Sequence, residues 1–142
     1  MSNNVKIRYQ DELSAEHKLA IIEGLNNNAY QQKELGNNNG SFSFCIEDND
    51  NKLLAGVSGF HYYGCFYVDL LFVEESVRGK GYGGHLMQKA EELAIERDCL
   101  FMAVNTMDFE AKPFYEKLGF EVEFVREGFE KESKMYFLRK EL

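Results

Sequence analysis

No long hydrophobic run occurs in this 142-residue sequence, and this absence argues against a position in a membrane. A membrane-spanning helix needs roughly 20 consecutive apolar residues, and no stretch approaches that length. The opening segment, MSNNVK, is polar and is not followed by an apolar segment, so we expect no signal peptide. We therefore expect a cytoplasmic protein that has no membrane partner.

Cysteine is scarce, and its few copies, Cys45, Cys65 and Cys99, are widely spaced. An odd number without close pairs fits neither a disulfide framework nor a zinc site, since both need characteristic spacings. Two of these cysteines lie in strand-like runs, and the third lies just before another strand-like run. We therefore expect reduced, mostly structural thiols. The histidines are scattered without ligand spacing, so we expect no bound metal.

Basic residues are outnumbered, because 16 lysines and arginines stand against 24 aspartates and glutamates, for a net charge of −8. Nucleic acids and anionic membranes are bound by clustered lysine and arginine, so we expect neither as a partner. The same charge would suit a cationic partner. It could equally do no more than keep the protein soluble, and the composition leaves both interpretations open.

Apolar residues, by contrast, suffice for a sizeable core, since 44% of the chain is hydrophobic. The length is usual for one domain, and with no repeat or linker we expect a single domain over residues 1–142. Residues 14–35 carry apolar side chains at helical spacing, which predicts helical structure. The run Asn26-Asn27-Asn28 predicts a break, and hence two N-terminal helices.

The rest of the chain alternates between strand and helix patterns. Three strands joined by short turns predict an antiparallel meander at 41–48, 52–63 and 65–73. An apolar stripe then predicts a helix over 84–97. The last segments predict a buried strand at 99–105, a short helix at 110–120 and a closing pair of strands at 120–127 and 132–141. The predicted fold is α/β with one mixed (α+β) sheet: N-terminal helices, an antiparallel β-meander, then β-α-β-α-β-β.

The segment VRGKGYGGHLM, residues 77–87, holds four glycines at the start of the third predicted helical region. Glycine weakens helices and strands, so the cluster needs a reason: a flexible turn, a dinucleotide-binding loop or another phosphate-binding loop. Gly79–Gly84 formally match G-x-G-x-x-G. However, a dinucleotide-binding loop follows the first strand of a βαβ unit, whereas this one lies about five residues beyond the third strand of a meander. The P-loop pattern is absent, because Lys80 is followed by Gly81.

A phosphate-binding loop of another kind fits best on physical grounds. The loop leads into a helix N-terminus, where free backbone N–H groups and the helix dipole favour an anion. Glycines allow the backbone to wrap closely around oxygen atoms, and Arg78 and Lys80 add positive charge. A simple turn would need neither feature.

The segment Arg78-Gly79-Lys80-Gly81-Tyr82-Gly83 resembles the Q/R-x-x-G-x-G/A signature of the GNAT superfamily, the acetyl-CoA-dependent N-acetyltransferases. The strand YVDLLFV before the loop, the later segment NTMDFEAKPFYEKLGF and the order of the elements resemble the same family over nearly the whole chain. The resemblance implies a GNAT-like fold and acetyl-CoA as co-substrate, with no metal.

The resemblance also implies which residues hold the cofactor. The backbone N–H groups of the glycine loop would bind the pyrophosphate of coenzyme A, through Arg78, Gly79, Lys80, Gly81, Tyr82, Gly83 and Gly84. The strand end at Leu71, Phe72 and Val73 would diverge from the next parallel strand, so that its free backbone groups pair with the pantetheine arm and polarise the acetyl carbonyl. Asn105 would line the same cleft; the alternative is that it only caps its strand.

Two catalytic roles follow from the resemblance and from the chemistry. Tyr115 matches the family tyrosine that faces the coenzyme sulfur, and a phenol with a pKa of about 10 can donate a proton to the departing thiolate. The alternative is a tyrosine that only packs beside its neighbours. A base must take the proton of the amine. Asp69, a carboxylate inside an apolar strand, and Glu74, at the strand exit, are equal candidates, with His61 behind them.

Three functions therefore compete. The leading one is an N-acetyltransferase that moves acetyl from acetyl-CoA directly to a primary amine, expected to be a small cationic amine or the lysine of a peptide. The second is a non-catalytic acyl-CoA-binding or regulatory module, and the third is an acyltransferase that uses another acyl-CoA. Tyr115 favours catalysis over binding alone. A homodimer is an assembly that the sequence leaves open.

Overall fold

The computed structural model describes residues 4–36 and 38–142. The chain divides after residue 37 into two compact units, each of which is described here by itself. In the first unit, helix α1 spans Ala15–Lys33. No helix in the described part of the chain is both long enough and apolar enough to cross a membrane.

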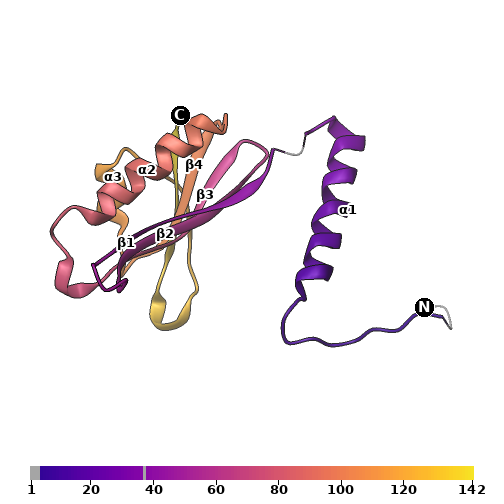
Figure 1. The fold of residues 1–142 in the computed structure, drawn as a ribbon, viewed down its shortest axis with the longest axis horizontal. Coiled ribbons are helices and arrows are strands. Elements are labelled where there is room, and N and C mark those ends of the chain that lie inside the picture. Colours follow the sequence, from indigo (N-terminus) through magenta and orange to yellow (C-terminus); the bar gives the residue numbers. More distant parts are fainter. Residues whose placement is uncertain (1–3, 37) are drawn as a thin grey trace. The chain divides into compact units, whose positions relative to one another are not determined.

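Helix α1 is continuous, so the predicted break into two helices is wrong (Figure 1). The Ser14 hydroxyl accepts a bond from the His17 N–H at 3.1 Å and caps the start. At the end, Glu34 adopts a left-handed conformation and donates its N–H to the Tyr30 carbonyl at 2.7 Å. Asparagine is a weak helix former, but it keeps its backbone N–H. Three of them, Asn26-Asn27-Asn28, therefore lower helix stability without interrupting the hydrogen bonds.

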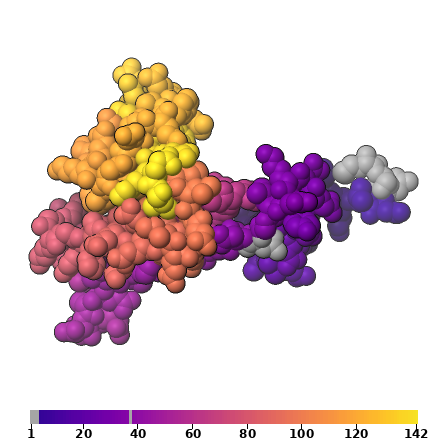
Figure 2. All heavy atoms as spheres, turned by 90° about the horizontal axis from the view of Figure 1, so that it is seen from above, coloured from indigo at the N-terminus to yellow at the C-terminus, as the bar shows by residue number. Residues whose placement is uncertain are grey.

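The second unit is built on one six-stranded sheet with the order β1-β2-β3-β4-β6-β5 (Figure 1). The strands are β1 (Gly40–Glu47), β2 (Leu53–Tyr62), β3 (Cys65–Val73), β4 (Phe101–Met107), β5 (Glu121–Arg126) and β6 (Met135–Glu141). Among these strands only β3 and β4 pair in parallel. In Figure 2 the purple residues of the β1–β2 region and the orange and yellow residues of the β5–β6 region lie on opposite sides of this unit.

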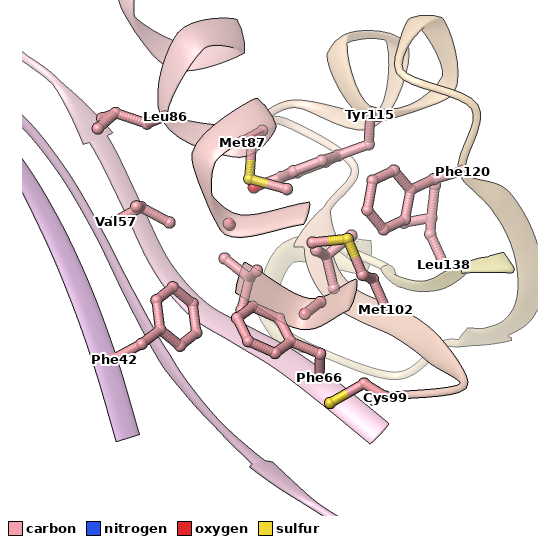
Figure 3. Close-up of a cluster of buried hydrophobic side chains, with 14 of the residues drawn as sticks. Phe42, Val57, Phe66, Leu86, Met87, Cys99, Met102, Tyr115, Phe120 and Leu138 are labelled. Atoms are coloured by element: carbon pink, nitrogen blue, oxygen red, sulfur yellow. The ribbon is translucent and has the colours of Figure 1, made fainter. Parts of the chain in front are cut away.

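Helix α2 (Tyr82–Glu96) packs on the sheet, with contacts to β1, β2, β3 and β4. Its buried side chains are Leu86, Met87, Ala90 and Ala94. Leu93, the fifth member of the apolar stripe that predicted this helix, is partly buried. Figure 3 shows Phe42, Val57 and Phe66 of the sheet on the side of Leu86 and Met87. We call this side of the sheet the helix face. Lys140 of β6 forms an ion pair with Glu91 of α2 at 3.0 Å, which connects β6 to the helix.

Helix α3 (Lys112–Lys117) and two 3-10 turns, η1 (Glu75–Val77) and η2 (Glu130–Glu132), complete the second unit. The mixed α/β fold class predicted from the sequence is confirmed. Element ends shift by a few residues. Strand β4 begins at Phe101 instead of residue 99, because the N–H groups of Cys99 and Leu100 bond to Ala94 and Gly64 carbonyls in a turn.

Candidate active site

Strands β3 and β4 separate partway along their length. They pair only from Cys65 with Phe101 to Val68 with Val104. Beyond that point β3 stays paired with β2 as far as Val73, while β4 stays paired with β6. Two parallel strands that follow different neighbours leave backbone groups on their facing edges without ladder partners. The resulting gap lies at the strand ends that the resemblance assigns to the cofactor.

A β-bulge at Asp69 marks the start of the gap. Val68 lies opposite Gly59 and Leu70 lies opposite Ser58, so Asp69 is an extra residue on β3. At Gly59 a Cβ atom would lie 1.9 Å from the Tyr67 carbonyl oxygen, so this position of β2 requires glycine. Asp69 is exposed, and its Oδ1 accepts a hydrogen bond from the Ser58 hydroxyl at 2.8 Å. The bulge thus fixes a carboxylate at the edge of the gap.

A cavity of about 190 Å³ lies in the gap between β3, β4 and the start of α3. Its lining brings together four of the residues singled out in the sequence (Asp69, Leu71, Asn105 and Tyr115) with Val68, Leu70, Thr106, Glu110 and Ala111. Side chains alternate along a strand between the two faces of a sheet. Buried Thr106 and Tyr115 line the cavity from the helix face, whereas Asn105 and Asp69 line it from the opposite face. The lining of the cavity therefore includes residues of both faces of the sheet.

Tyr115 is buried, with 6% of its surface exposed, and its ring meets those of Phe114 and Phe120 edge-on at 5.2 and 5.8 Å. Figure 3 shows it between Met87 and Phe120 in the core below α2. Burial, and then the charge of Glu110, raise the pKa of Tyr115 to about 12. The phenol therefore remains a hydrogen-bond donor at any physiological pH.

Glu110 and Thr106 were not identified from the sequence. Glu110 Oε1 accepts the Met107 N–H at 2.8 Å, and Thr106 Oγ1 accepts the Ala111 N–H at 3.1 Å. Both side chains thereby shape the turn that carries the chain from β4 into α3. The Glu110 bond spans three residues, a recurrent local spacing that could have marked this residue in the sequence. The Thr106 bond spans five residues and matches none of the recurrent local spacings.

The glycine loop connects η1 to α2. Gly79 and Gly81 have positive φ values of 83° and 82°, which other residues adopt only with strain. A Cβ atom at either position would meet no atom within 4 Å, so the loop borders open space. At Gly83 a Cβ atom would lie 3.3 Å from the Phe114 ring, so this glycine allows α2 to pack against α3.

The start of α2 presents free backbone donors to this open space. Its first helical hydrogen bond runs from the His85 N–H to the Gly81 carbonyl at 3.0 Å. The N–H groups of Tyr82, Gly83 and Gly84 precede that bond and take no part in the helical ladder. Arg78 donates its Nε to the Val73 carbonyl at 3.0 Å, which joins the loop to the end of β3, and Lys80 is exposed.

The two other candidate bases lie outside the lining of the cavity. Glu74 caps η1, where its carboxylate accepts bonds from the Ser76 N–H at 3.1 Å and from the Ser76 hydroxyl. These bonds, with smaller effects of Lys52 and Arg78, lower the pKa of Glu74. A lowered pKa makes it a weaker base.

His61 is buried on the helix face of β2. Its Nδ1 lies 3.2 Å from Arg97 Nη1 and its Nε2 lies 3.3 Å from Asn38 Oδ1. Burial, and then the charge of Arg97, lower its pKa. Neither His61 nor Glu74 is among the described residues that line the cavity. Within the described chain, no group of three or more His, Cys, Asp or Glu side chains could hold a metal ion.

Comparison with known proteins agrees with this geometry. An acetyltransferase of Agrobacterium fabrum is 40% identical over 75 residues, which are 53% of this chain and 55% of that protein. Blasticidin-S acetyltransferase of Streptomyces morookaense is 37% identical over 70 residues, 49% of this chain and 52% of that protein. The chain thus spans about half the length of the curated relatives it matches.

A solved structure from Agrobacterium tumefaciens superposes with a TM-score of 0.80 at 28% identity, over 97% of this chain and 100% of that chain. Residues 8–120 match the acetyltransferase (GNAT) family. That match includes the strands that separate, the glycine loop and helix α3. The chain belongs to the acetyltransferase (GNAT) family.

Proposed function

We propose that this protein transfers the acetyl group of acetyl-CoA directly to the primary amine of a small cationic molecule. The observation that carries the proposal is the cavity where β3 and β4 separate, whose lining comes from both faces of the sheet. A thioester held on the helix face and an amine on the opposite face could meet inside it. In such an arrangement the amine attacks the thioester directly, so no covalent acyl-enzyme intermediate is needed. Residues of both faces of the sheet then act on the same thioester carbonyl.

The glycine loop fits the pyrophosphate of coenzyme A. Free N–H groups at the start of α2 and the helix dipole favour an anion, and positive-φ glycines expose the backbone to it. Lys80 is exposed beside this surface and can add charge. The open space at Gly79 and Gly81 accommodates a ligand that contacts the backbone closely. Beside it, the end of β3 at Leu71–Val73 has no β4 partner and can offer backbone groups of its free edge to the pantetheine arm, apart from the Val73 carbonyl, which accepts a hydrogen bond from Arg78.

Tyr115 serves the leaving group. The amine nitrogen forms a bond to the carbonyl carbon, the carbon–sulfur bond breaks, and the sulfur departs as a thiolate. A phenol with a pKa of about 12 is a weaker acid than a thiol, so Tyr115 stabilises this thiolate mainly by donating a hydrogen bond. The nitrogen gives one proton to the base as the amide forms, and the released thiolate takes one proton from the solvent, so the exchange is balanced overall.

Asp69 is the base that the geometry supports better. Its carboxylate lines the cavity on the face opposite Tyr115, where an ammonium could approach, and it can take the proton that leaves a free amine. Glu74 is the second candidate. Its capping bonds to Ser76 and its lowered pKa argue against proton abstraction there.

The acceptor is proposed to be cationic on electrostatic grounds. Asp69 and Glu110 both line the cavity, and the chain carries a net charge of −8. Carboxylates at a reaction cavity attract an ammonium group and disfavour an acidic acceptor. The relative named blasticidin-S acetyltransferase supports a small-molecule acceptor over a protein lysine.

The test is a thiol-release assay with acetyl-CoA and a panel of cationic, neutral and acidic amines, with a melting curve in the presence of acetyl-CoA. We expect a raised melting temperature and thiol release with cationic amines. Stabilisation by acetyl-CoA without thiol release from any amine would indicate a binding module. Release only with another acyl-CoA would reassign the donor.

A further inference from the structure

Tyr67 lies at the point where β3 and β4 separate, on the face of the sheet opposite α2. It is opposite Ala103, one pair before the last parallel pair. Its hydroxyl oxygen accepts a hydrogen bond from Asn105 Nδ2 at 3.1 Å. Asn105 lines the cavity, so this bond connects Tyr67 directly to the reaction site.

The ring of Tyr67 is held in one orientation. The Phe60 ring of β2 packs against it edge-on, with 5.3 Å between centroids. The Asn105 amide fixes the hydroxyl end. On the same face, Asp69 bonds to Ser58, two residues before Phe60. A ring fixed at both ends presents its hydroxyl in a defined direction without a further entropic cost when a ligand binds.

The hydroxyl hydrogen of Tyr67 remains available to a ligand. A phenol accepts through its oxygen and donates its single hydrogen, and the Asn105 amide occupies only the accepting side. Within the part of the chain that the structure describes, no group accepts that hydrogen. Burial, and then the charge of Asp69, raise the pKa of Tyr67, so the hydroxyl stays protonated.

We propose that Tyr67 is a specificity-determining residue that donates its hydroxyl hydrogen to an oxygen of the acceptor, close to the amine that Asp69 attracts. The inference rests on the proposed function. It narrows the acceptor to amines that also carry a hydroxyl or carbonyl oxygen near the nitrogen. A site built around a fixed donor discriminates against an analogue that lacks the oxygen, because the donor then loses its partner.

The experiment measures kcat/KM for matched amines, 2-aminoethanol against propylamine and 3-aminopropanol against butylamine. We expect the wild-type protein to prefer the hydroxylated member by about five- to tenfold, as one neutral hydrogen bond allows. Tyr67→Phe keeps the ring and should abolish the preference. Neither Tyr67 nor Tyr62 lines the cavity itself, but Tyr67 is hydrogen-bonded to the lining residue Asn105, whereas the side-chain partner of Tyr62 is Cys65. Tyr62→Phe, on the neighbouring strand β2, is therefore the matched control. It should keep the preference.

The inference would be overturned if Tyr67→Phe and wild type preferred the hydroxylated amine equally, or if the wild type showed no such preference. In either case, thiol release from amines would leave the proposed function intact. No thiol release from any amine would instead refute the proposed function, and the inference with it. A loss of preference in Tyr62→Phe as well would assign the effect to the sheet face as a whole and also overturn the role of Tyr67.

Discussion

Replacing Gly81 by alanine separates the stability of the glycine loop from its ligand binding. Gly81 has φ of 82°, and a Cβ atom there would meet no atom within 4 Å. The methyl group therefore causes no clash, and its cost comes from the left-handed backbone, about 1–2 kcal/mol. For a chain of this size, about 1 kcal/mol lowers the melting temperature by roughly 3 °C. We expect Gly81→Ala to melt about 3–6 °C below wild type.

Binding of coenzyme A should fall by more than this strain explains. The added methyl group occupies the open space beside the free N–H groups at the start of α2, where the pyrophosphate is proposed to lie. Separation of those donors from the phosphate oxygens by one methyl group should weaken binding at least tenfold, or about 1.4 kcal/mol. Isothermal titration with coenzyme A at a temperature where both proteins are folded measures the change directly.

Gly128 provides the matched control. It lies in the loop between β5 and β6, has φ of 91° and also has no atom within 4 Å of a Cβ position. Gly128→Ala should therefore lose a similar amount of stability and bind coenzyme A like wild type. Equal affinity for coenzyme A in both variants and in wild type would refute the assignment of the glycine loop. Equal weakening in both would show that strain, and not position, causes the loss.

Three further predictions concern the proposed catalytic groups. Tyr115→Phe should lower kcat by roughly 100-fold with little change in the affinity for coenzyme A, measured by thiol release and titration; an unchanged chemical step in single-turnover assays would remove Tyr115 from the mechanism. The pKa of Tyr115 rises to about 12 in the folded state. The stability that the buried neutral phenol contributes to the folded protein is therefore complete below pH 10 and is lost as the pH rises towards 12. Denaturant unfolding between pH 9 and 12 should show a loss of about 2–3 kcal/mol that Tyr115→Phe lacks, and parallel curves would contradict this burial argument. Asp69→Asn should lose activity at neutral pH and regain part of it at high pH, where the amine is neutral, whereas Glu74→Gln should not; the reverse pattern would make Glu74 the base.

The sequence predicted the parts of the fold that follow regular periodicity. The apolar stripe that includes Leu86 and Met87 identified α2, and the alternation in β1 to β3 identified the meander. The three asparagines predicted a break that α1 does not have, because a helix with both ends capped tolerates weak helix formers in its interior. Tyr67 could not be found, since its role depends on a contact between strands that are far apart in the sequence. Glu110 was overlooked, although its bond to the Met107 N–H has a recurrent local spacing.

Asp69 shows why the candidate site, unlike the fold, could not be predicted in full from the sequence. In the run YVDLLFV, strict alternation from buried Phe66 and Val68 would turn Leu70 and Phe72 towards the helix face. The structure shows the reverse, with Leu70 and Phe72 exposed and Leu71 partly buried, because the bulge at Asp69 shifts the register by one residue.

That shift depends on Gly59 of the neighbouring strand, since any larger residue there would collide with the Tyr67 carbonyl oxygen. The sequence by itself shows that Asp69 is a carboxylate inside an apolar strand. The pairing of β3 with the neighbouring strand β2 cannot be read from this run alone, and that pairing places Asp69 in the lining of the cavity. The same local irregularity therefore positions the candidate base, turns Leu71 towards the core and places Tyr67 and Asp69 on one face, where an acceptor could contact both.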